Sequence, residues 1–234
     1  MAIHLLFDLI SYIVAGYLSW RYFKSTHLIK DENLRWYYYT VLVAGFVIGS
    51  VGLSTLNNYL SLDGQVILGK SILGALFGGI LFSEVFKWRM GIKGSTGAYF
   101  VPSLAIGIAI GRIGCFLAGL EDYTYGVETI LPCGVDFGDG VSRHPVQLYE
   151  SMAMFGFFGI SVWRYRVDRS GFERTIFYQF ILWYAVQRFV WELLKPYEPI
   201  AWGIDLFGWI CLLLIGYALW FLRRFDLVER SVTV

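Results

Sequence analysis

Two arginines stand in stretches of the sequence that are otherwise apolar or small. Arg112 lies in GRIGCFLAG, residues 111–119, and Arg188 begins RFVWELLKP, residues 188–196. A charged side chain in apolar surroundings is costly unless it faces a protected interior and holds a partner. The planar guanidinium pairs well with the oxygens of a phosphate group. Two such groups therefore suit the binding of a phosphate, and a lipid headgroup drawn inward would supply one.

Further polar residues belong to the same level of the molecule. By the helical rise of 1.5 Å per residue, Arg112 and Arg188 each lie about 10 Å inside the end of an apolar block. Glu192 follows Arg188 by four residues and shares its helix face. The stretch RHPVQLYES, residues 143–151, leads into another block from the same side. The sequence predicts one polar site with these members: Arg112, Glu121, Arg143, His144, Gln147, Tyr149, Glu150, Arg188 and Glu192.

A second interpretation of these charges is purely structural. Arg188 would pair with Glu192, and Arg112 would pair with Glu150 or Glu121. The opposite half of the apolar blocks is nearly bare of charge, which favours a site over scattered ion pairs.

The elements that must position these residues are long apolar blocks. The chain has 234 residues, of which 57% are hydrophobic and 16% charged, whereas about a quarter of a soluble domain is charged. A helix needs about 20 predominantly apolar residues to cross a bilayer. Seven blocks qualify, at 3–23, 37–60, 66–88, 97–119, 147–166, 175–194 and 204–222. They predict an all-α polytopic membrane protein with seven transmembrane helices, and a single domain over residues 1–234.

The loops between the blocks predict an orientation. Lys and Arg collect on cytoplasmic loops, and here they follow the first, third, fifth and seventh blocks. They are Arg21, Lys24, Lys30, Arg35, Lys87, Arg89, Lys93, Arg164, Arg166, Arg169, Arg174, Arg223, Arg224 and Arg230. The N-terminus is therefore predicted outside and the C-terminus in the cytoplasm, so the polar site lies in the outer half of the membrane.

Glycines recur at a spacing of four residues in several blocks. The pairs are Gly45 and Gly49, Gly74 and Gly78, and Gly107 and Gly111. Small residues at this spacing let helices cross closely. Gly111 and Gly114 also flank Arg112 and would leave room for a ligand beside it.

The motifs together resemble those of the prolipoprotein diacylglyceryl transferase family. GRIGCFLAG resembles its Gly-Arg-x-x-Asn-Phe-x-x-Gly signature, RHPVQLYE its Arg-His-Pro-x-Gln-Leu-Tyr-Glu motif, and RFVWE its late Arg-x-x-x-Glu. LGALFGGILF resembles the family's helix bearing His-Gly-Gly. The resemblance runs from about Gly74 to Gly208.

The resemblance implies an enzyme of the bacterial inner membrane, with several spans and an active site towards the outer leaflet. Such an enzyme moves the diacylglyceryl group of phosphatidylglycerol to the lipobox cysteine of a prolipoprotein, and glycerol phosphate leaves. The implied partners are phosphatidylglycerol, other membrane lipids and the prolipoprotein signal peptide. Nucleic acid, a cofactor and a metal are not expected.

Roles for individual residues follow from the resemblance. Arg112 is its signature arginine and Arg188 its late arginine, and both would stabilise the departing phosphate. His144 is predicted as the base that deprotonates the incoming thiol, because it is the only histidine that the sequence places near the site; a structural role beside Pro145 is the alternative. The expected substrate-binding residues are Arg143, Gln147, Tyr149, Glu150, Glu192, Gly111, Gly114, Cys115, Gly119 and Glu121.

Three positions depart from the family's motifs. Phe77 stands in place of the histidine, Cys115 in place of the signature asparagine, and Ala118 in place of a second asparagine. A covalent role for Cys115 would need a neighbouring base, and the sequence places none beside it. Two other functions remain open: a non-catalytic lipid-binding or carrier protein on the same scaffold, and a transporter of a small anion. A transporter would be expected to show paired broken helices in two repeats, and the sequence shows no internal repeat.

Overall fold

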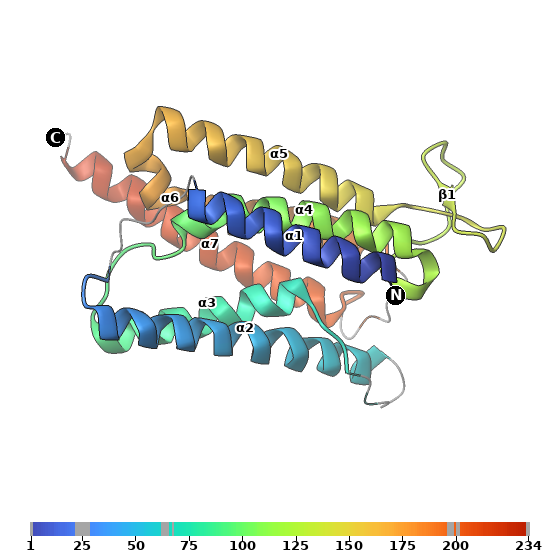
Figure 1. Cartoon of the computed structure of the whole chain (residues 1–234), viewed down its shortest axis with the longest axis horizontal. Helices are drawn as coiled ribbons and strands as arrows, with labels where there is room; N and C mark the ends of the chain where they lie inside the picture. Colours follow the sequence, from blue (N-terminus) through green and yellow to red (C-terminus); the bar gives the residue numbers. More distant parts are fainter. Residues whose placement is uncertain are drawn as a thin grey trace. The chain divides into compact units, whose positions relative to one another are not determined.

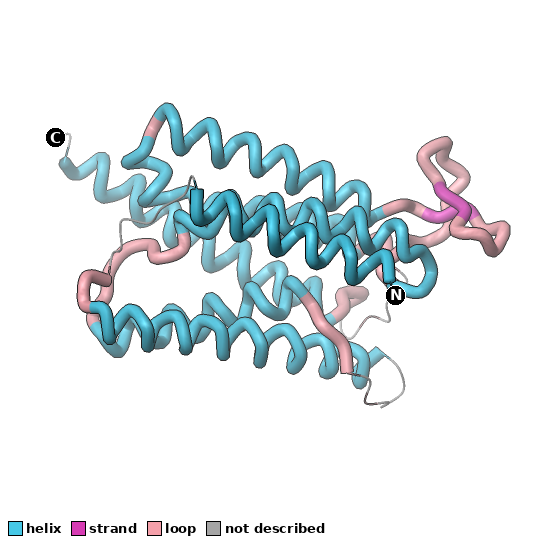
Figure 2. Tube along the Cα trace, in the orientation of Figure 1, coloured by secondary structure: helices cyan, strands magenta, loops and turns pink. Residues whose placement is uncertain are grey.

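The structure, a computed structural model, describes residues 2–21, 29–61, 66, 68–195, 199 and 202–232, without the side chains of 2, 61 and 225–232. Residues 22–23 and 67 of the predicted spans, Lys24 and the side chain of Arg230 lie outside this description. Within it the chain forms seven α-helices and little else (Figures 1 and 2). They are α1 (Ala2–Arg21), α2 (Glu32–Ser61), α3 (Ile72–Met90), α4 (Val101–Ala118), α5 (Val146–Val167), α6 (Arg169–Glu192) and α7 (Leu206–Val232).

The short elements lie around α4. The 3-10 helix η1 (Ala98–Phe100) precedes it and η2 (Gly119–Asp122) follows it. Strands β1 (Val135–Asp136) and β2 (Ser142–Arg143) then pair antiparallel in the loop before α5. The sequence did not predict these two strands, because two residues each are too few to show an alternating pattern.

Among the residues that the structure describes, four segments are long and apolar enough to cross a membrane. They are Ile3–Arg21, Glu32–Leu60, Ala98–Asp122 and Leu206–Arg224, and they match the first, second, fourth and seventh predicted blocks. The all-α class is therefore confirmed. Membrane crossing by α3, α5 and α6 stays a prediction; α5 and α6 carry charged residues of the polar site, which lower their hydropathy.

The chain divides into two compact units. Unit 1 contains residues 1–25, 97–196 and 215–234, and unit 2 contains residues 26–96 and 197–214. The helix α7 is shared, with its first turns in unit 2 and its remainder in unit 1. All residues predicted for the polar site belong to unit 1, whereas Phe77 belongs to unit 2.

Unit 2 is built on a close crossing of α2 and α3. A Cβ added to Gly49 would lie 2.2 Å from the carbonyl oxygen of Gly74, and one added to Gly78 would lie 2.2 Å from the carbonyl oxygen of Gly45. Backbone meets backbone at these points, which only glycine permits. The close packing predicted for these two glycine pairs is confirmed.

In unit 1, α4 packs against α1 on one side and α5 on another, and α6 packs against α5. Figure 1 shows that α1 and α5 run in the direction opposite to α4. The first turns of α1 and α5 therefore lie at the same end of this unit as the last turns of α4. Gly107 lies against Ser11 and Ala15 of α1 at ordinary contact distance, whereas Gly111 faces open space.

Candidate functional site

A buried ion cluster joins three helices of unit 1. Glu150 of α5 lies at its centre, where one carboxylate oxygen is 2.8 Å from Nε of Arg112 in α4 and 2.9 Å from Nη1 of Arg188 in α6. Nε of Arg188 also lies 2.8 Å from Glu192. Lys195, just beyond the end of α6, lies 3.4 Å from the same Glu192 oxygen. We call these five residues the ion cluster.

The ion cluster brings buried charges of both signs together. Two arginines and one lysine face two carboxylates across these contacts. Every side chain in it is at most 7% exposed. Buried charges are stable only when paired and hydrogen-bonded. Two guanidinium groups held at one place in this way suit the oxygens of a phosphate group.

A buried amide adjoins the cluster on α5. Gln147 is 1% exposed, and neither its Oε1 nor its Nε2 has a hydrogen-bond partner in the described part of the chain. Glu150 lies three residues further along, and its Oε1 is likewise buried without a hydrogen-bond partner among the described residues. Buried polar groups in proteins are nearly always paired. These atoms can donate to and accept from a polar ligand held beside the arginines.

Backbone contacts fix the helices that carry the cluster. The hydroxyl of Ser151 donates to the carbonyl of Ala109 at 2.8 Å, which ties the start of α5 to α4. The indole of Trp183 donates to the carbonyl of Ala153 at 3.1 Å, which ties α6 to α5. Helices in direct contact thus bring Arg112, Glu150 and Arg188 of the predicted polar site together.

The structural ion pairs considered from the sequence are also present. Arg188 pairs with Glu192, and the partner of Arg112 is Glu150. Glu121 is exposed and lies in η2. These ion pairs lie next to the Gln147 amide, which has no hydrogen-bond partner among the described residues. The same helices therefore offer both structural ion pairs and polar atoms for a ligand.

The residues at the start of α5 form a separate group. Nδ1 of His144 lies 3.3 Å from the hydroxyl of Tyr149, and that hydroxyl donates to the sulfur of Cys133 at 3.3 Å. Arg143 pairs with Asp139 at 2.8 Å and lies over the ring of Tyr125. These side chains bind loop residues instead of the ion cluster.

A histidine that the sequence analysis did not consider lies against Cys115. Nε2 of His4, in the first turn of α1, is 3.5 Å from Sγ of Cys115, and Nη1 of Arg112 is 3.6 Å from the same sulfur. The prediction that no base lies beside Cys115 is wrong, and His144 is not the only histidine near the site. The sequence could not show this, because the contact depends on how α1 docks on α4.

The glycines predicted at the site differ in what surrounds them. A Cβ at Gly114 would lie 2.5 Å from Cβ of Phe7, so this glycine lets α1 approach α4. Gly111 has open space beside it, as a ligand next to Arg112 would require. Gly119 ends α4 with φ +64°, a conformation that glycine adopts readily.

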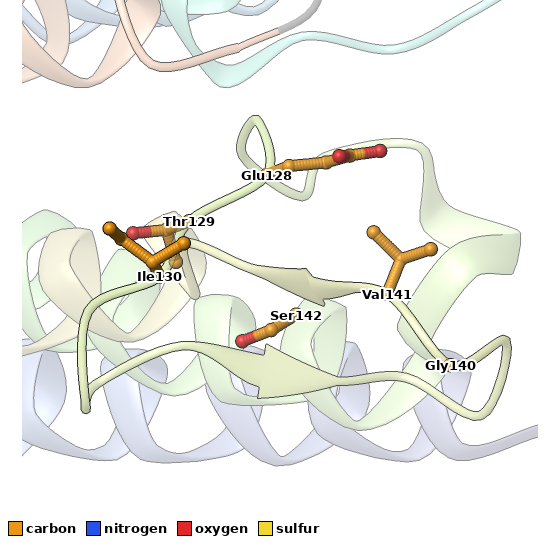
Figure 3. A pocket seen from close by; sticks show the side chains of 6 residues that line it. All are labelled: Glu128, Thr129, Ile130, Gly140, Val141 and Ser142. Atoms are coloured by element: carbon orange, nitrogen blue, oxygen red, sulfur yellow. The ribbon is translucent and has the colours of Figure 1, made fainter.

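A hollow in the loop beside β1 and β2 lies next to Arg143, whose Nη1 donates to the carbonyl of Val141 in its lining. Figure 3 shows the side chains that line it, and none belongs to the ion cluster: Glu128, Thr129, Ile130, Gly140, Val141 and Ser142.

Comparison with known proteins decides the family. A family model described as prolipoprotein diacylglyceryl transferase matches residues 4–224, which include the whole ion cluster and His4. The chain belongs to the prolipoprotein diacylglyceryl transferase family. The resemblance of its three motifs is thereby confirmed.

Individual relatives carry the name phosphatidylglycerol–prolipoprotein diacylglyceryl transferase. The one from Solidesulfovibrio magneticus is 34% identical over 164 residues, or 63% of this chain and 59% of the relative. The one from Teredinibacter turnerae is 35% identical over 148 residues, or 61% and 49%. The one from Nitratidesulfovibrio vulgaris is 29% identical over 211 residues, or 83% and 76%. The chain thus matches about half to three fifths of the length of the first two relatives.

The motif residues named in the sequence analysis lie in different parts of the fold. Arg112, Glu150 and Arg188 belong to the ion cluster, and the sulfur of Cys115 lies 3.6 Å from Nη1 of Arg112. Phe77 is half-buried in α3 of unit 2.

Proposed function

We propose that this protein transfers the diacylglyceryl group of phosphatidylglycerol to the cysteine thiol of a prolipoprotein, with release of glycerol phosphate. The relatives are named for this reaction. The observation that carries the proposal is the convergence of Arg112 and Arg188 on one oxygen of Glu150, next to the buried Gln147, whose amide has no hydrogen-bond partner among the described residues. Phosphatidylglycerol carries a phosphodiester, whose oxygens would pair with guanidinium groups, and glycerol hydroxyls, which would bind an amide.

The ion cluster has donors for such a headgroup. A guanidinium has five N–H donors, and the contacts of Arg112 described above use Nε for Glu150 and Nη1 for Cys115. The remaining N–H groups of Arg112 would donate hydrogen bonds to the phosphate oxygens, and the amide of Gln147 would bind the glycerol hydroxyls. The headgroup or the acceptor peptide would also contact predicted site residues that lie outside the ion cluster, at what we call the rim of the site: Arg143, Tyr149, Gly119 and Glu121.

The reaction requires little more than placement and charge. A thiolate attacks the glyceryl carbon that bears the phosphate, and the carbon–oxygen bond breaks. The departing phosphate gains a second negative charge, which cations already in place stabilise in the transition state. Arg112 and Arg188 would supply this stabilisation. His144 is the proposed proton acceptor at the rim, with Tyr149 as its hydrogen-bonded neighbour.

We further propose how the protein sits in the membrane. All seven helices cross the bacterial inner membrane, the N-terminus lies outside and the C-terminus lies in the cytoplasm. Residues 1–234 then act as one transferase domain whose site faces the outer leaflet. The signal peptide of the prolipoprotein would reach the site from the same leaflet as the lipid.

The test is an assay with purified protein, phosphatidylglycerol and a lipobox peptide. Two products are followed, released glycerol phosphate and lipidated peptide. Arg112→Ala and Arg188→Ala are each expected to lower kcat at least about 100-fold, as removal of one transition-state donor does. Arg89→Ala is the control, because Arg89 is an exposed arginine at the end of α3, and it is expected to keep full activity.

Two outcomes would contradict the proposal. Glycerol phosphate without lipidated peptide would indicate another acceptor, such as water. Neither product, with phosphatidylglycerol still bound in a manner that depends on Arg112 and Arg188, would indicate a non-catalytic carrier.

A further inference from the structure

Three potential metal ligands meet where α1 docks on the end of α4. Nε2 of His4 lies 3.2 Å from Oδ1 of Asp122 and 3.5 Å from Sγ of Cys115. The three ligand atoms all lie within 4.8 Å of one another. They come from α1, from α4 and from η2, so only the folded unit assembles them.

The local structure explains why they meet. Gly114 lets Phe7 approach α4 to a distance that a Cβ would block, and this seats the first turns of α1 beside Cys115. Gly119 then ends α4 with a positive φ, and η2 carries Asp122 back toward His4. Cys115 is buried, whereas Asp122 and His4 are 14% and 33% exposed. A ligand could therefore reach the group from one side.

The distances fit a tetrahedral zinc ion. Zinc binds His, Asp and Cys at about 2.0, 2.1 and 2.3 Å, which separates tetrahedral N and O ligands by about 3.4 Å and N and S ligands by about 3.6 Å. The observed separations of 3.2 Å and 3.5 Å lie within a few tenths of an ångström of these values. The Asp122 oxygen and the Cys115 sulfur lie within 4.8 Å of each other, against about 3.6 Å in a tetrahedral zinc site, so these two atoms would approach each other by up to about 1 Å.

A second carboxylate completes the pattern. Nδ1 of His4 lies 3.1 Å from Oδ2 of Asp8, one helical turn along α1. A zinc-bound histidine almost always donates its other ring N–H to a carboxylate or carbonyl, which fixes the ring and the tautomer. This contact is independent of the three ligands and is what a zinc-binding His4 requires.

We propose that His4, Cys115 and Asp122 bind one Zn²⁺ ion, with the fourth position left for the acceptor thiolate. The role of the ion in catalysis rests on the function proposed above, whereas the binding of zinc does not. Three protein ligands with an open fourth position are the arrangement of catalytic zinc sites. The arginine that contacts the Cys115 sulfur is Arg112 of the ion cluster, so the thiolate and the phosphate would be neighbours.

The ion would change how the acceptor thiol is activated. A thiol that coordinates zinc loses its proton, which His144, the proton acceptor proposed above, would take directly or through water. The sulfur then forms a bond to the glyceryl carbon, the carbon–oxygen bond breaks, and its electron pair leaves with glycerol phosphate. The neutral thioether product binds zinc weakly and departs.

A direct nucleophilic role for Cys115 is a poorer explanation of the same contacts. Attack by its sulfur on the glyceryl carbon would form a thioether on the protein. No second thiol would displace that thioether readily, because a thiolate bound to saturated carbon is a poor leaving group. The enzyme would be alkylated once and stop, so His4 and Cys115 serve a turnover reaction better as metal ligands.

The experiment measures zinc in the full-length protein without reference to activity. Protein purified in detergent without chelators is expected to hold close to one zinc per chain by elemental analysis. Cobalt, exchanged for zinc, is expected to give the visible absorption of a tetrahedral site and a thiolate-to-cobalt charge-transfer band. Cys115→Ser is expected to lose that band, and His4→Gln and Asp122→Asn to lower the zinc content.

Two further variants separate the metal site from folding and from other thiols. Asp8→Asn keeps all three ligands and is expected to weaken zinc affinity about 10- to 100-fold. Cys133→Ser removes an exposed thiol of the loop and is expected to leave the zinc content and the cobalt spectrum unchanged.

Some results would overturn the zinc site alone. Protein without zinc whose transferase activity survives chelators would mean that His4 has only a structural role, in its contacts with Asp8 and Asp122. Equal zinc loss in Cys133→Ser would place the metal elsewhere. Zinc bound through His4, Cys115 and Asp122 in a protein without transferase activity would instead uphold the site and reject the proposed function.

Discussion

Glu150 separates two guanidiniums that would otherwise repel each other inside the protein. Its carboxylate lies within 2.9 Å of both Arg112 and Arg188 and is 3% exposed. Removing one partner of a buried ion pair costs about 3–5 kcal/mol, because the remaining charges stay buried without compensation. We therefore expect Glu150→Gln to lower the free energy of unfolding by about this amount, measured by thermal or denaturant unfolding in detergent.

The control for this prediction is Glu32→Gln. Glu32 is exposed in the first turn of α2, where loss of a carboxylate costs about 0.3–1 kcal/mol. Equal effects of the two variants would show that Glu150 does not hold the arginines together. Added phosphatidylglycerol should recover part of the stability of Glu150→Gln, because a bound phosphate would replace the missing charge.

At the scale of residues, the sequence predicted the members of the ion cluster that are charged residues within apolar blocks. Arg112 and Arg188 stand in apolar blocks at a matched depth, with Glu192 one helical turn from Arg188 and Glu150 near the end of another block. The cost of burying charge indicates that such residues pair with one another. His4 and Asp122 carry no such signal. A histidine near the start of the chain and an aspartate in a loop are ordinary until α1 docks on α4.

At the scale of elements, the spacing of glycines predicted that helices pack closely, but it did not predict which glycines lie at the contact. Gly49 and Gly52 lie on the same helix, yet only Gly49 touches α3. A Cβ on Gly49 would come within 2.2 Å of a backbone oxygen, and one on Gly52 would touch nothing within 4 Å. Gly107 and Gly111 also have the spacing of four residues that predicts close packing. A Cβ on Gly107 would contact α1, whereas one on Gly111 would have open space around it.

These two glycines of α2 form a matched pair for a stability measurement. Gly49→Ala is expected to lower the unfolding temperature in detergent, because backbone atoms of α2 and α3 must move apart. Gly52→Ala is expected to leave it unchanged or to raise it, since alanine is favoured over glycine in a helix by up to about 1 kcal/mol. Similar destabilisation by both substitutions would contradict the close crossing of α2 and α3.

Helix boundaries followed the apolar pattern where polar residues did not interrupt it. The predicted block 147–166 became α5 (Val146–Val167), whereas the block 66–88 became a helix only from Ile72. Ser71 explains the later start, because its side chain caps the helix by accepting from the backbone N–H of Gly74 at 3.2 Å. The helix α6 begins at Arg169, earlier than the predicted start at residue 175. Its N-cap is Asp168, whose side chain accepts a hydrogen bond from the backbone N–H of Gly171.

At the scale of the whole molecule, the charge in the loops predicts one orientation in the membrane. The directions of the helices then predict which loops lie on each side. The loop between α4 and α5 carries Cys133, which is exposed, while Cys115 and Cys211 are buried. If the N-terminus lies outside, this loop is outside too, because α1 and α5 run opposite to α4 in unit 1. The loop between α3 and α4, with exposed Lys93, is then in the cytoplasm.

We therefore expect a membrane-impermeant maleimide to label the protein at Cys133 in intact spheroplasts. Cys133→Ser should abolish this labelling, since the other two thiols are shielded inside unit 1 and unit 2 respectively. In a Cys133→Ser background, Lys93→Cys should react only after the membrane is permeabilised. Labelling of the cysteine at position 93, but not of Cys133, in intact spheroplasts would place the site on the cytoplasmic side of the membrane. A prolipoprotein thiol would then reach the site before the protein is exported.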